Sequence, residues 1–235
     1  MKNHQFRKGM LHGVPIMLGY LSVSFGFGIL AIQKNLSILA AVGISVTNLT
    51  SAGQVAGVGV IAAGGSLLEM ILCQLVINLR YSLMSLSLSQ RLDKSFTLPH
   101  RLIAAFGVTD EIFAVASVQP EPVTPPYMYG LILTPFIGWT GGTLLGAAAG
   151  NIMPARVTAA LSLMLYGMFI AIIIPPAKKS GRVLLAVVLS AGLSILCKVL
   201  LPALSDGFAV IICALAASVV TAIFFPAPER GEGSS

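Results

Sequence analysis

Residues 127–150 read YMYGLILTPFIGWTGGTLLGAAAG, an apolar run without a single charged side chain. A helix that crosses the hydrocarbon core of a bilayer needs about 20 largely apolar residues, so this run is long enough. Its glycines recur at every fourth position, at Gly138, Gly142, Gly146 and Gly150. That spacing removes side chains from one stripe of the helix and lets another backbone approach closely. The sequence therefore predicts a membrane-spanning helix that is packed tightly against a second element.

The composition of the whole chain agrees with a bilayer environment. Of 235 residues, 56% are hydrophobic and 9% are charged, whereas a soluble domain carries about 25% charged residues. The net charge is +6, and the basic residues stand at the N-terminus and between apolar stretches, as in loops that face a cytoplasm. No basic run is interleaved with aromatic residues. We therefore predict a protein of the lipid bilayer with no nucleic-acid partner.

Apolar stretches of spanning length predict about seven full spans plus one short broken or re-entrant helix within residues 36–54. The spans are 14–32, 55–79, 102–118, 127–150, 157–177, 183–204 and 207–225. The predicted fold class is all-α, a polytopic transmembrane helix bundle. We expect one transmembrane domain over residues 1–226, with candidate halves 1–118 and 127–226. A polar C-terminal tail follows over residues 227–235.

The short segment ends in the polar, glycine-containing run Asn48-Leu49-Thr50-Ser51-Ala52-Gly53-Gln54. Irregular backbone at membrane depth is tolerated only where protein or a water-filled cavity surrounds it. We therefore expect residues 36–54 to form a half-helix and a break that face the interior. A tight interfacial loop is the alternative.

Loop charges predict the orientation of the first half. Basic residues before the first span and in residues 91–101 should face the cytoplasm, which makes the N-terminus cytoplasmic. An even number of crossings then separates them, and residues 119–126 fall outside. Simple counting also places Lys178-Lys179-Ser180-Gly181-Arg182 outside, against the rule. Either a second segment fails to cross or this loop is an exception, and two inverted halves would also resolve the conflict.

Two groups of polar residues are candidates for binding a solute. A helix that begins near Gln54 would point its N–H groups and positive dipole end into the protein, where Ser51 and Gln54 could help to hold a carboxylate. An ordinary N-cap and turn is the alternative. Gln74, Asn78 and Tyr81 share one helix face, which must meet protein or water. They line a pathway, or they bond helix to helix.

Charged residues inside the apolar stretches are candidates for proton coupling. Asp110 and Glu111 lie near the middle of their stretch, where an acid costs roughly 2.5–3.5 kcal/mol to insert and needs a partner or a proton. Arg80 is a suitable partner for Asp110. The functional interpretation is a proton-coupling carboxylate, and the structural one is a neutralising ion pair. Glu69 is a weaker candidate for the same role.

Signatures of enzymes, metal sites and cofactor sites are missing from the sequence. There is no glycine-rich phosphate loop with a lysine, no paired-histidine motif and no nucleophile elbow. Cys73, Cys197 and Cys213 lie in apolar stretches without metal-ligand spacing, and we expect free thiols. We predict a protein that is not an enzyme and that needs no cofactor or metal.

Five elements follow one another along the chain. They are an early glycine- and proline-rich helix, a break, an Asn-x-Arg-aromatic element, an Asp-Glu-x-Phe-Ala element and a Gly-Trp-x-x-Gly-Thr element. In this chain they are Gly13-Val14-Pro15 with Ser24 to Gly28, Ser51 to Gln54, Asn78 to Leu88, Asp110 to Ala114, and Gly138 to Thr143. Their order and spacing resemble the AzlC family of branched-chain amino acid permeases. The chain departs from the family at Tyr81, where histidine is common, and at Gly53.

The resemblance implies a secondary transporter subunit in the bacterial inner or plasma membrane. It would export leucine, isoleucine, valine or similar hydrophobic amino acids with proton coupling, together with a small AzlD-like membrane subunit. Two other classes fit the same residues. A passive channel for small solutes would share the polar stripe but show no gradient dependence, and a non-transporting structural subunit would use the charges only for pairing.

Overall fold

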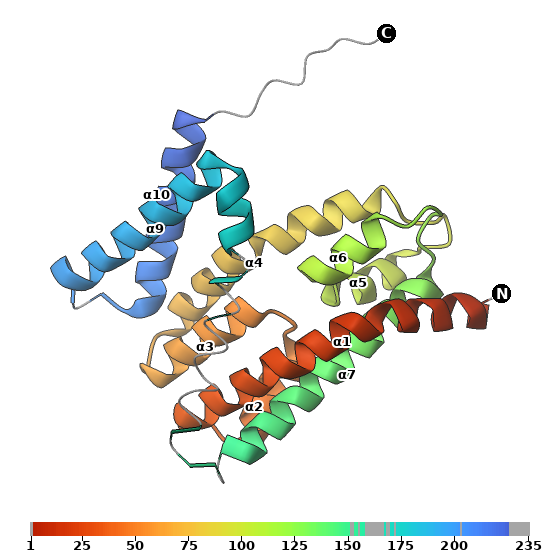
Figure 1. The fold of residues 1–235 in the computed structure, drawn as a ribbon, viewed down its shortest axis with the longest axis horizontal. Helices are drawn as coiled ribbons and strands as arrows, with labels where there is room; N and C mark the ends of the chain where they lie inside the picture. Colours follow the sequence, from red (N-terminus) through yellow and green to blue (C-terminus); the bar gives the residue numbers. More distant parts are fainter. Residues whose placement is uncertain are drawn as a thin grey trace.

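A computed structural model describes residues 2–150, 153, 154, 156, 157, 167, 170, 171, 173–202 and 204–225. The described residues fold as helices joined by short turns (Figure 1). The helices are α1 (Lys2–Gln33), α2 (Ile38–Thr47), α3 (Ser51–Ala62), α4 (Leu67–Ser89), α5 (Leu98–Phe106), α6 (Asp110–Ser117), α7 (Pro125–Gly150), α9 (Gly181–Leu200) and α10 (Asp206–Phe224). The predicted all-α class is confirmed.

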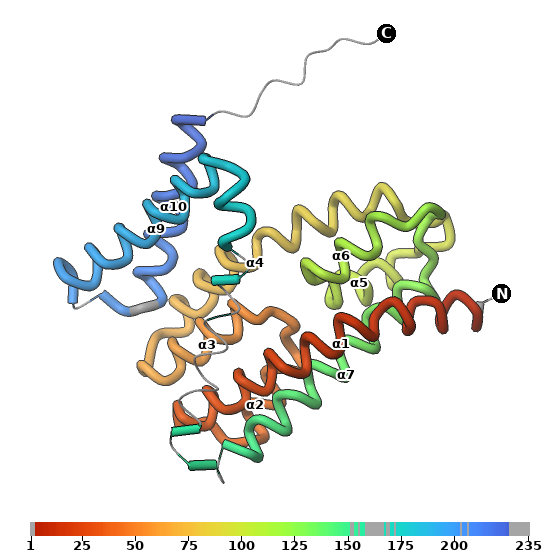
Figure 2. The backbone as a smooth tube through the Cα atoms, viewed as in Figure 1, coloured from red at the N-terminus to blue at the C-terminus, as the bar shows by residue number. Residues whose placement is uncertain are grey.

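Helices α1 and α7 run side by side in the same direction over almost their whole length (Figures 1 and 2). A Cβ at Gly138 would overlap Met17, one at Gly142 would overlap Leu21, and one at Gly146 would overlap the backbone of Phe25. At Gly150 a Cβ would meet Ile29 at ordinary contact distance. The glycine stripe therefore packs against another helix, as the sequence predicts, and that helix is α1.

Helices α2 and α3 form a re-entrant hairpin. We call its turn, residues 48–50, the first tip. Leu49 packs with Tyr20, near the middle of α1, whereas Val58 in α3 packs with Ala41 and with Phe27 nearer the end of α1. The chain therefore descends to mid-depth along α2 and returns along α3 to the end from which it came. The predicted half-helix and break over residues 36–54 is confirmed.

The next turn changes the predicted second span. Residues 55–79 do not form one crossing, because α3 ends at Ala62 and α4 begins at Leu67. Gly64 has φ 67°, a left-handed conformation that glycine adopts without strain, and the Ser66 side chain accepts a hydrogen bond from the Glu69 N–H to cap α4. The two helices are antiparallel, and α4 makes the return crossing.

Residues 102–118 do not span either, which is a second correction. Gly107 ends α5 after 9 residues, and Thr109 caps α6, which has 8 residues. Residues 107–109 form a second tip. Beyond α6 the chain returns to the start of α5, where Val123 exchanges backbone hydrogen bonds with Arg91 and Asp93.

The corrected path moves the loop at residues 119–126 to the other side of the bundle. Glu121 and Val123 line a small surface pocket together with Gln5 and Lys8 of α1. We call this side, marked by Lys8, Arg91 and Lys94, the basic end. The loop was expected outside, away from the basic residues, and that expectation is wrong because α5 and α6 together make no crossing.

Within the described residues, five helices are long and apolar enough to cross a membrane, namely α1, α4, α7, α9 and α10. The expected span at 157–177 falls largely outside the described residues, as does the expected tail at 227–235. Only α1, α4 and α7 cross before residue 150. A crossing by the expected span at 157–177, which lies largely outside the described residues, would bring Lys178 and Arg182 to the basic end and would remove the conflict in the loop charges.

Candidate functional site

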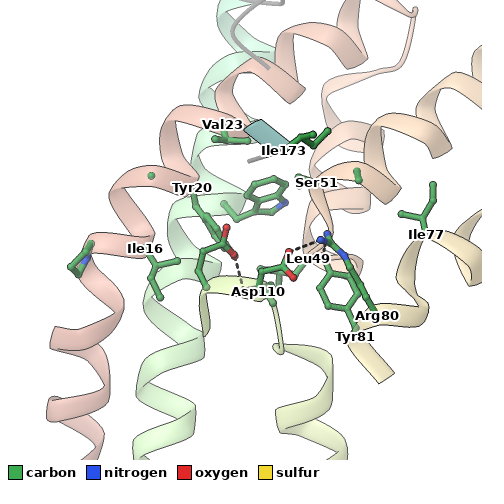
Figure 3. A pocket seen from close by; sticks show the side chains of 16 residues that line it. Ile16, Tyr20, Val23, Leu49, Ser51, Ile77, Arg80, Tyr81, Asp110 and Ile173 are labelled. Carbon is green, nitrogen blue, oxygen red and sulfur yellow. Dashed lines mark hydrogen bonds and ion pairs between the residues drawn. The ribbon is translucent and has the colours of Figure 1, made fainter. Parts of the chain in front are cut away.

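A cavity of about 730 Å³ lies at mid-depth, between the two tips and beside α1, α4 and α7 (Figure 3). Ligand sites in proteins commonly have volumes of this order. Its walls are mostly apolar, with a few polar and charged groups. The lining residues are Pro15, Ile16, Gly19, Tyr20, Val23, Leu49, Ser51, Ala52, Ile77, Arg80, Tyr81, Thr109, Asp110, Glu111, Trp139 and Ile173.

The two tips present helix N-termini to the cavity in the same way. Thr50 has extended backbone and its hydroxyl accepts from the Gly53 N–H at 3.2 Å. Thr109 is also extended, and its hydroxyl accepts from the Ile112 N–H at 3.4 Å. Threonine is a favoured N-cap because its oxygen satisfies an N–H that the helix cannot. The positive ends of α3 and α6 therefore meet at mid-depth from opposite sides of the bundle.

Opposite charges meet across the cavity between α4 and α6. Nη1 of Arg80 lies 2.7 Å from Oδ2 of Asp110, and the two side chains are 44% and 46% exposed. The guanidinium also lies over the ring of Tyr81, 4.9 Å from its centroid, and donates to the Tyr81 hydroxyl at 3.1 Å. The predicted pairing of Arg80 with Asp110 is present. Because the pair remains half-exposed, a solute in the cavity can reach both charges.

The second acid, Glu111, is held by a residue of α1. The Tyr20 hydroxyl lies 2.5 Å from Oε2 of Glu111 and 2.6 Å from the Thr109 hydroxyl. A phenol has one proton, so Tyr20 donates it to the carboxylate and accepts from Thr109. The Tyr20 ring also meets Trp139 edge to face at 5.2 Å. These contacts join α1 and α7 to the second tip.

Gln54, Gln74 and Asn78 lie beside the first tip but do not line the cavity. The Gln54 amide, 1% exposed, donates to the Asn48 carbonyl and closes the break. Thr50 donates to Asn78 at 2.8 Å, Asn78 donates to Gln74 at 3.0 Å, and Gln74 donates to the Gly53 carbonyl at 2.7 Å. This chain of hydrogen bonds fixes the first tip against α4. Of the candidate site residues, Ser51, Arg80, Tyr81, Asp110 and Glu111 line the cavity.

Three lining residues escaped the sequence-based interpretation. Tyr20 lies within an uncharged apolar run, and nothing local marks its bond to Glu111. Thr109 precedes two acids, a common N-cap pattern that would have located the second tip. Trp139 is 3% exposed, and its indole nitrogen has no hydrogen-bond partner among the described residues. Buried donors without partners are rare, so this nitrogen is a functional candidate.

Glu69 lies away from the cavity, at the end of the bundle opposite the basic end. It is 3% exposed, and its Oε1 accepts from the Ser205 hydroxyl and, at 3.1 Å, from the Gly207 N–H. The carboxylate thus caps the start of α10 and joins it to α4. Across the described part of the chain, no group of three or more His, Cys, Asp or Glu side chains could hold a metal ion.

Comparisons with known proteins agree with this architecture. The sequence pattern of the AzlC protein family matches residues 15–153. An uncharacterized membrane protein of Archaeoglobus fulgidus is 35% identical, with 75% of this chain and 78% of the relative aligned. The inner membrane protein YgaZ of Escherichia coli is 30% identical, with 72% of each aligned.

A more distant relative is an uncharacterized membrane protein of Helicobacter pylori, 27% identical over 62% of this chain and 64% of that protein. No solved structure matches. The matched region, residues 15–153, contains α2–α6, most of α1 and all of α7, and therefore every described lining residue of the cavity except Ile173. The chain belongs to the AzlC family, a family of membrane proteins associated with branched-chain amino acid transport.

Proposed function

We propose that this chain is the larger subunit of a secondary transporter that exports leucine, isoleucine, valine or similar amino acids through the central cavity. The observation that carries the proposal is the half-exposed Arg80–Asp110 pair beside apolar walls at mid-depth. Charged side chains are rare inside membrane proteins and commonly mark the pathways of substrates and ions. A small zwitterion with an aliphatic side chain matches both the charges and the walls.

The geometry supports one orientation of the substrate. Its carboxylate would lie toward the start of α3, near Ser51 and Arg80, where free N–H groups and a cation attract an anion. Its ammonium group would lie toward Asp110 and Glu111. Each end of the zwitterion would then take the place of one partner in the ion pair, so that no charge is left bare. The aliphatic side chain would contact Ile16, Val23 and Leu49.

Proton coupling is proposed for the same acids. A proton on Asp110 would weaken its attraction to Arg80 and to the substrate's ammonium group, which favours release. Glu111 already holds the phenolic proton of Tyr20 in a hydrogen bond and is a candidate relay. Export direction and a small AzlD-like membrane subunit are proposed from the family resemblance.

The test is flux of labelled leucine in liposomes, with and without the small subunit and with an imposed pH gradient. Asp110→Asn and Glu111→Gln should each lower gradient-driven flux by tenfold or more. Asp93→Asn removes an acid from an exposed loop and is the matched control. Equal flux in all three variants would refute proton coupling.

The same assay separates the two rival functions. A passive channel would give leucine flux that does not respond to the pH gradient. A structural subunit would give no flux of any aliphatic amino acid, with or without the small subunit. Flux of other solutes, but none of leucine, isoleucine or valine, would refute the proposed substrate.

A further inference from the structure

A second cavity, of about 630 Å³, lies outside the central site on the surface of the helix pair α9–α10. Its wall on α9 is a single helix face formed by Val183, Ala186, Val187, Ser190 and Ala191, because these positions recur every three or four residues. Thr221 of α10 and Ile173 complete it. We call this cavity the lateral groove.

Within the part of the chain that the structure describes, the helix that carries the lateral groove is largely exposed. Helix α9 has no buried residue in its 20 positions, and its mean hydropathy is 2.5. Such a helix is stable only in an apolar surrounding, so its surface faces acyl chains. Small side chains such as Ala186 and Ala191 hollow this surface and leave room for a chain to lie in it.

One end of the groove is strongly basic. Arg182 lines it, and its guanidinium lies 5.7 Å from the centroid of the Phe225 ring. Lys178 and Lys179 precede it by three or four residues and are exposed. The sequence contains no acidic residue between Glu121 and Asp206. Among the described residues, none of these three cations has a carboxylate within ion-pair distance.

The position of Arg182 along the membrane normal fits a headgroup region. Helix α10 begins beside Glu69, at the end opposite the basic end, and finishes beside Arg182 after 19 residues. At 1.5 Å per residue these span about 28 Å, close to the thickness of the hydrocarbon core. A helix of this length allows Arg182 to reach the headgroup region on the side opposite Glu69, where anionic headgroups would attract it.

We propose that the lateral groove binds an anionic phospholipid. The phosphate of the headgroup would be held by Arg182 with Lys178 and Lys179, and one acyl chain would lie along Val183, Val187 and Ala191. A zwitterionic lipid would fill the groove equally well but would bring a cation against these three cations. A transmembrane segment of another protein could cover the apolar face but would leave them without a counter-charge.

The test is native mass spectrometry of the full-length protein in detergent with equimolar phosphatidylglycerol and phosphatidylcholine of identical acyl chains. The wild-type protein should retain phosphatidylglycerol preferentially. Arg182→Gln should reduce the ratio of the two adducts by about fivefold, the effect of losing one cation near an anionic headgroup. Arg182→Lys keeps the charge and should keep most of the preference.

Three further measurements decide the source of any change in lipid retention. Arg91→Gln removes an equal charge from the loop at the basic end and should leave the ratio unchanged. Inorganic phosphate should not displace the lipid, because it lacks the acyl chain. Ala186→Phe fills the groove without altering charge and should lower the retention of both lipids. Equal retention of both lipids by the wild type, or an equal effect of Arg91→Gln and Arg182→Gln, would overturn the proposal.

Discussion

Arg80 and Asp110 form an ion pair that is only half-covered, at a depth where an unpaired charge is expensive. Removing one partner leaves the other bare, so Arg80→Gln should harm the protein more than the loss of one contact would. We expect leucine kcat/KM to fall by at least tenfold, which corresponds to the roughly 1.5–3 kcal/mol of a charge-assisted hydrogen bond.

A double variant separates stability from transport in this pair. Arg80→Gln with Asp110→Asn leaves two neutral amides, which can bond to each other. Its thermal midpoint should recover relative to Arg80→Gln, while leucine flux stays low because both charges that would receive the zwitterion are gone. Recovery of flux along with stability would show that the pair is only structural.

Trp139 is the only tryptophan in the chain, and it lines the central cavity. Its fluorescence therefore reports on that cavity alone. Leucine should change the emission in a saturable way, whereas isopentylamine, which lacks the carboxylate, should produce a smaller change. Unaltered emission at leucine concentrations that saturate flux would place the substrate elsewhere.

The site could be predicted from the sequence only where placing a side chain in the hydrocarbon core costs much free energy. Arg80, Asp110 and Glu111 stand out because charge inside an apolar run demands a reason, and all three line the cavity. Gln54 and Asn78 are equally polar, yet they hold the first tip in place. Sequence spacing does not separate these roles, because both need a polar group that faces inward. The sequence around Tyr20 does not mark it as a site residue, because its hydrogen-bond partners are about 90 residues away along the chain.

Helices α1 and α7 are in backbone contact along one glycine stripe. Gly142→Val should destabilise the protein by about 1–3 kcal/mol or more, because a side chain there meets the backbone of Leu21 in the middle of the contact. Gly141→Val is the matched control, since a Cβ at Gly141 meets nothing within 4 Å. Thermal unfolding in detergent measures both, and equal losses would contradict the packing described above.

Hydropathy predicted the long helices well and the short ones poorly, for a physical reason. Residues 55–79 and 102–118 are apolar enough to span, so a window average treats each as one helix. The structure interrupts them at Gly64 and at Gly107 to Thr109, where a left-handed turn and an N-cap reverse the chain. The first tip, at residues 48–50, was detectable because several polar residues accompany it. The second tip, at residues 107–109, has fewer polar residues before it, and its local signals were Gly107 and the N-cap pattern of Thr109 followed by two acids.

The path of the chain through the bilayer predicts from which side of the membrane a given residue can be labelled. In a background without the three native cysteines, Asn3→Cys and Glu121→Cys should react with a membrane-impermeant maleimide from the same side. Ala63→Cys, in the turn between α3 and α4, should react from the other side. If α5 and α6 crossed the membrane, Glu121→Cys would instead label together with Ala63→Cys.

The two hairpins also determine where the membrane voltage is felt. Each enters from its own side and stops at mid-depth, so water that reached the central cavity past one tip would leave an insulating layer much thinner than the bilayer. Most of the potential drop would then fall across the few residues of the tips. A proton that moves past Asp110 would cross most of the electric field in a few ångströms, and each 100 mV would contribute up to about 2.3 kcal/mol to that step. Transport by this chain should therefore respond to electrical potential as well as to pH.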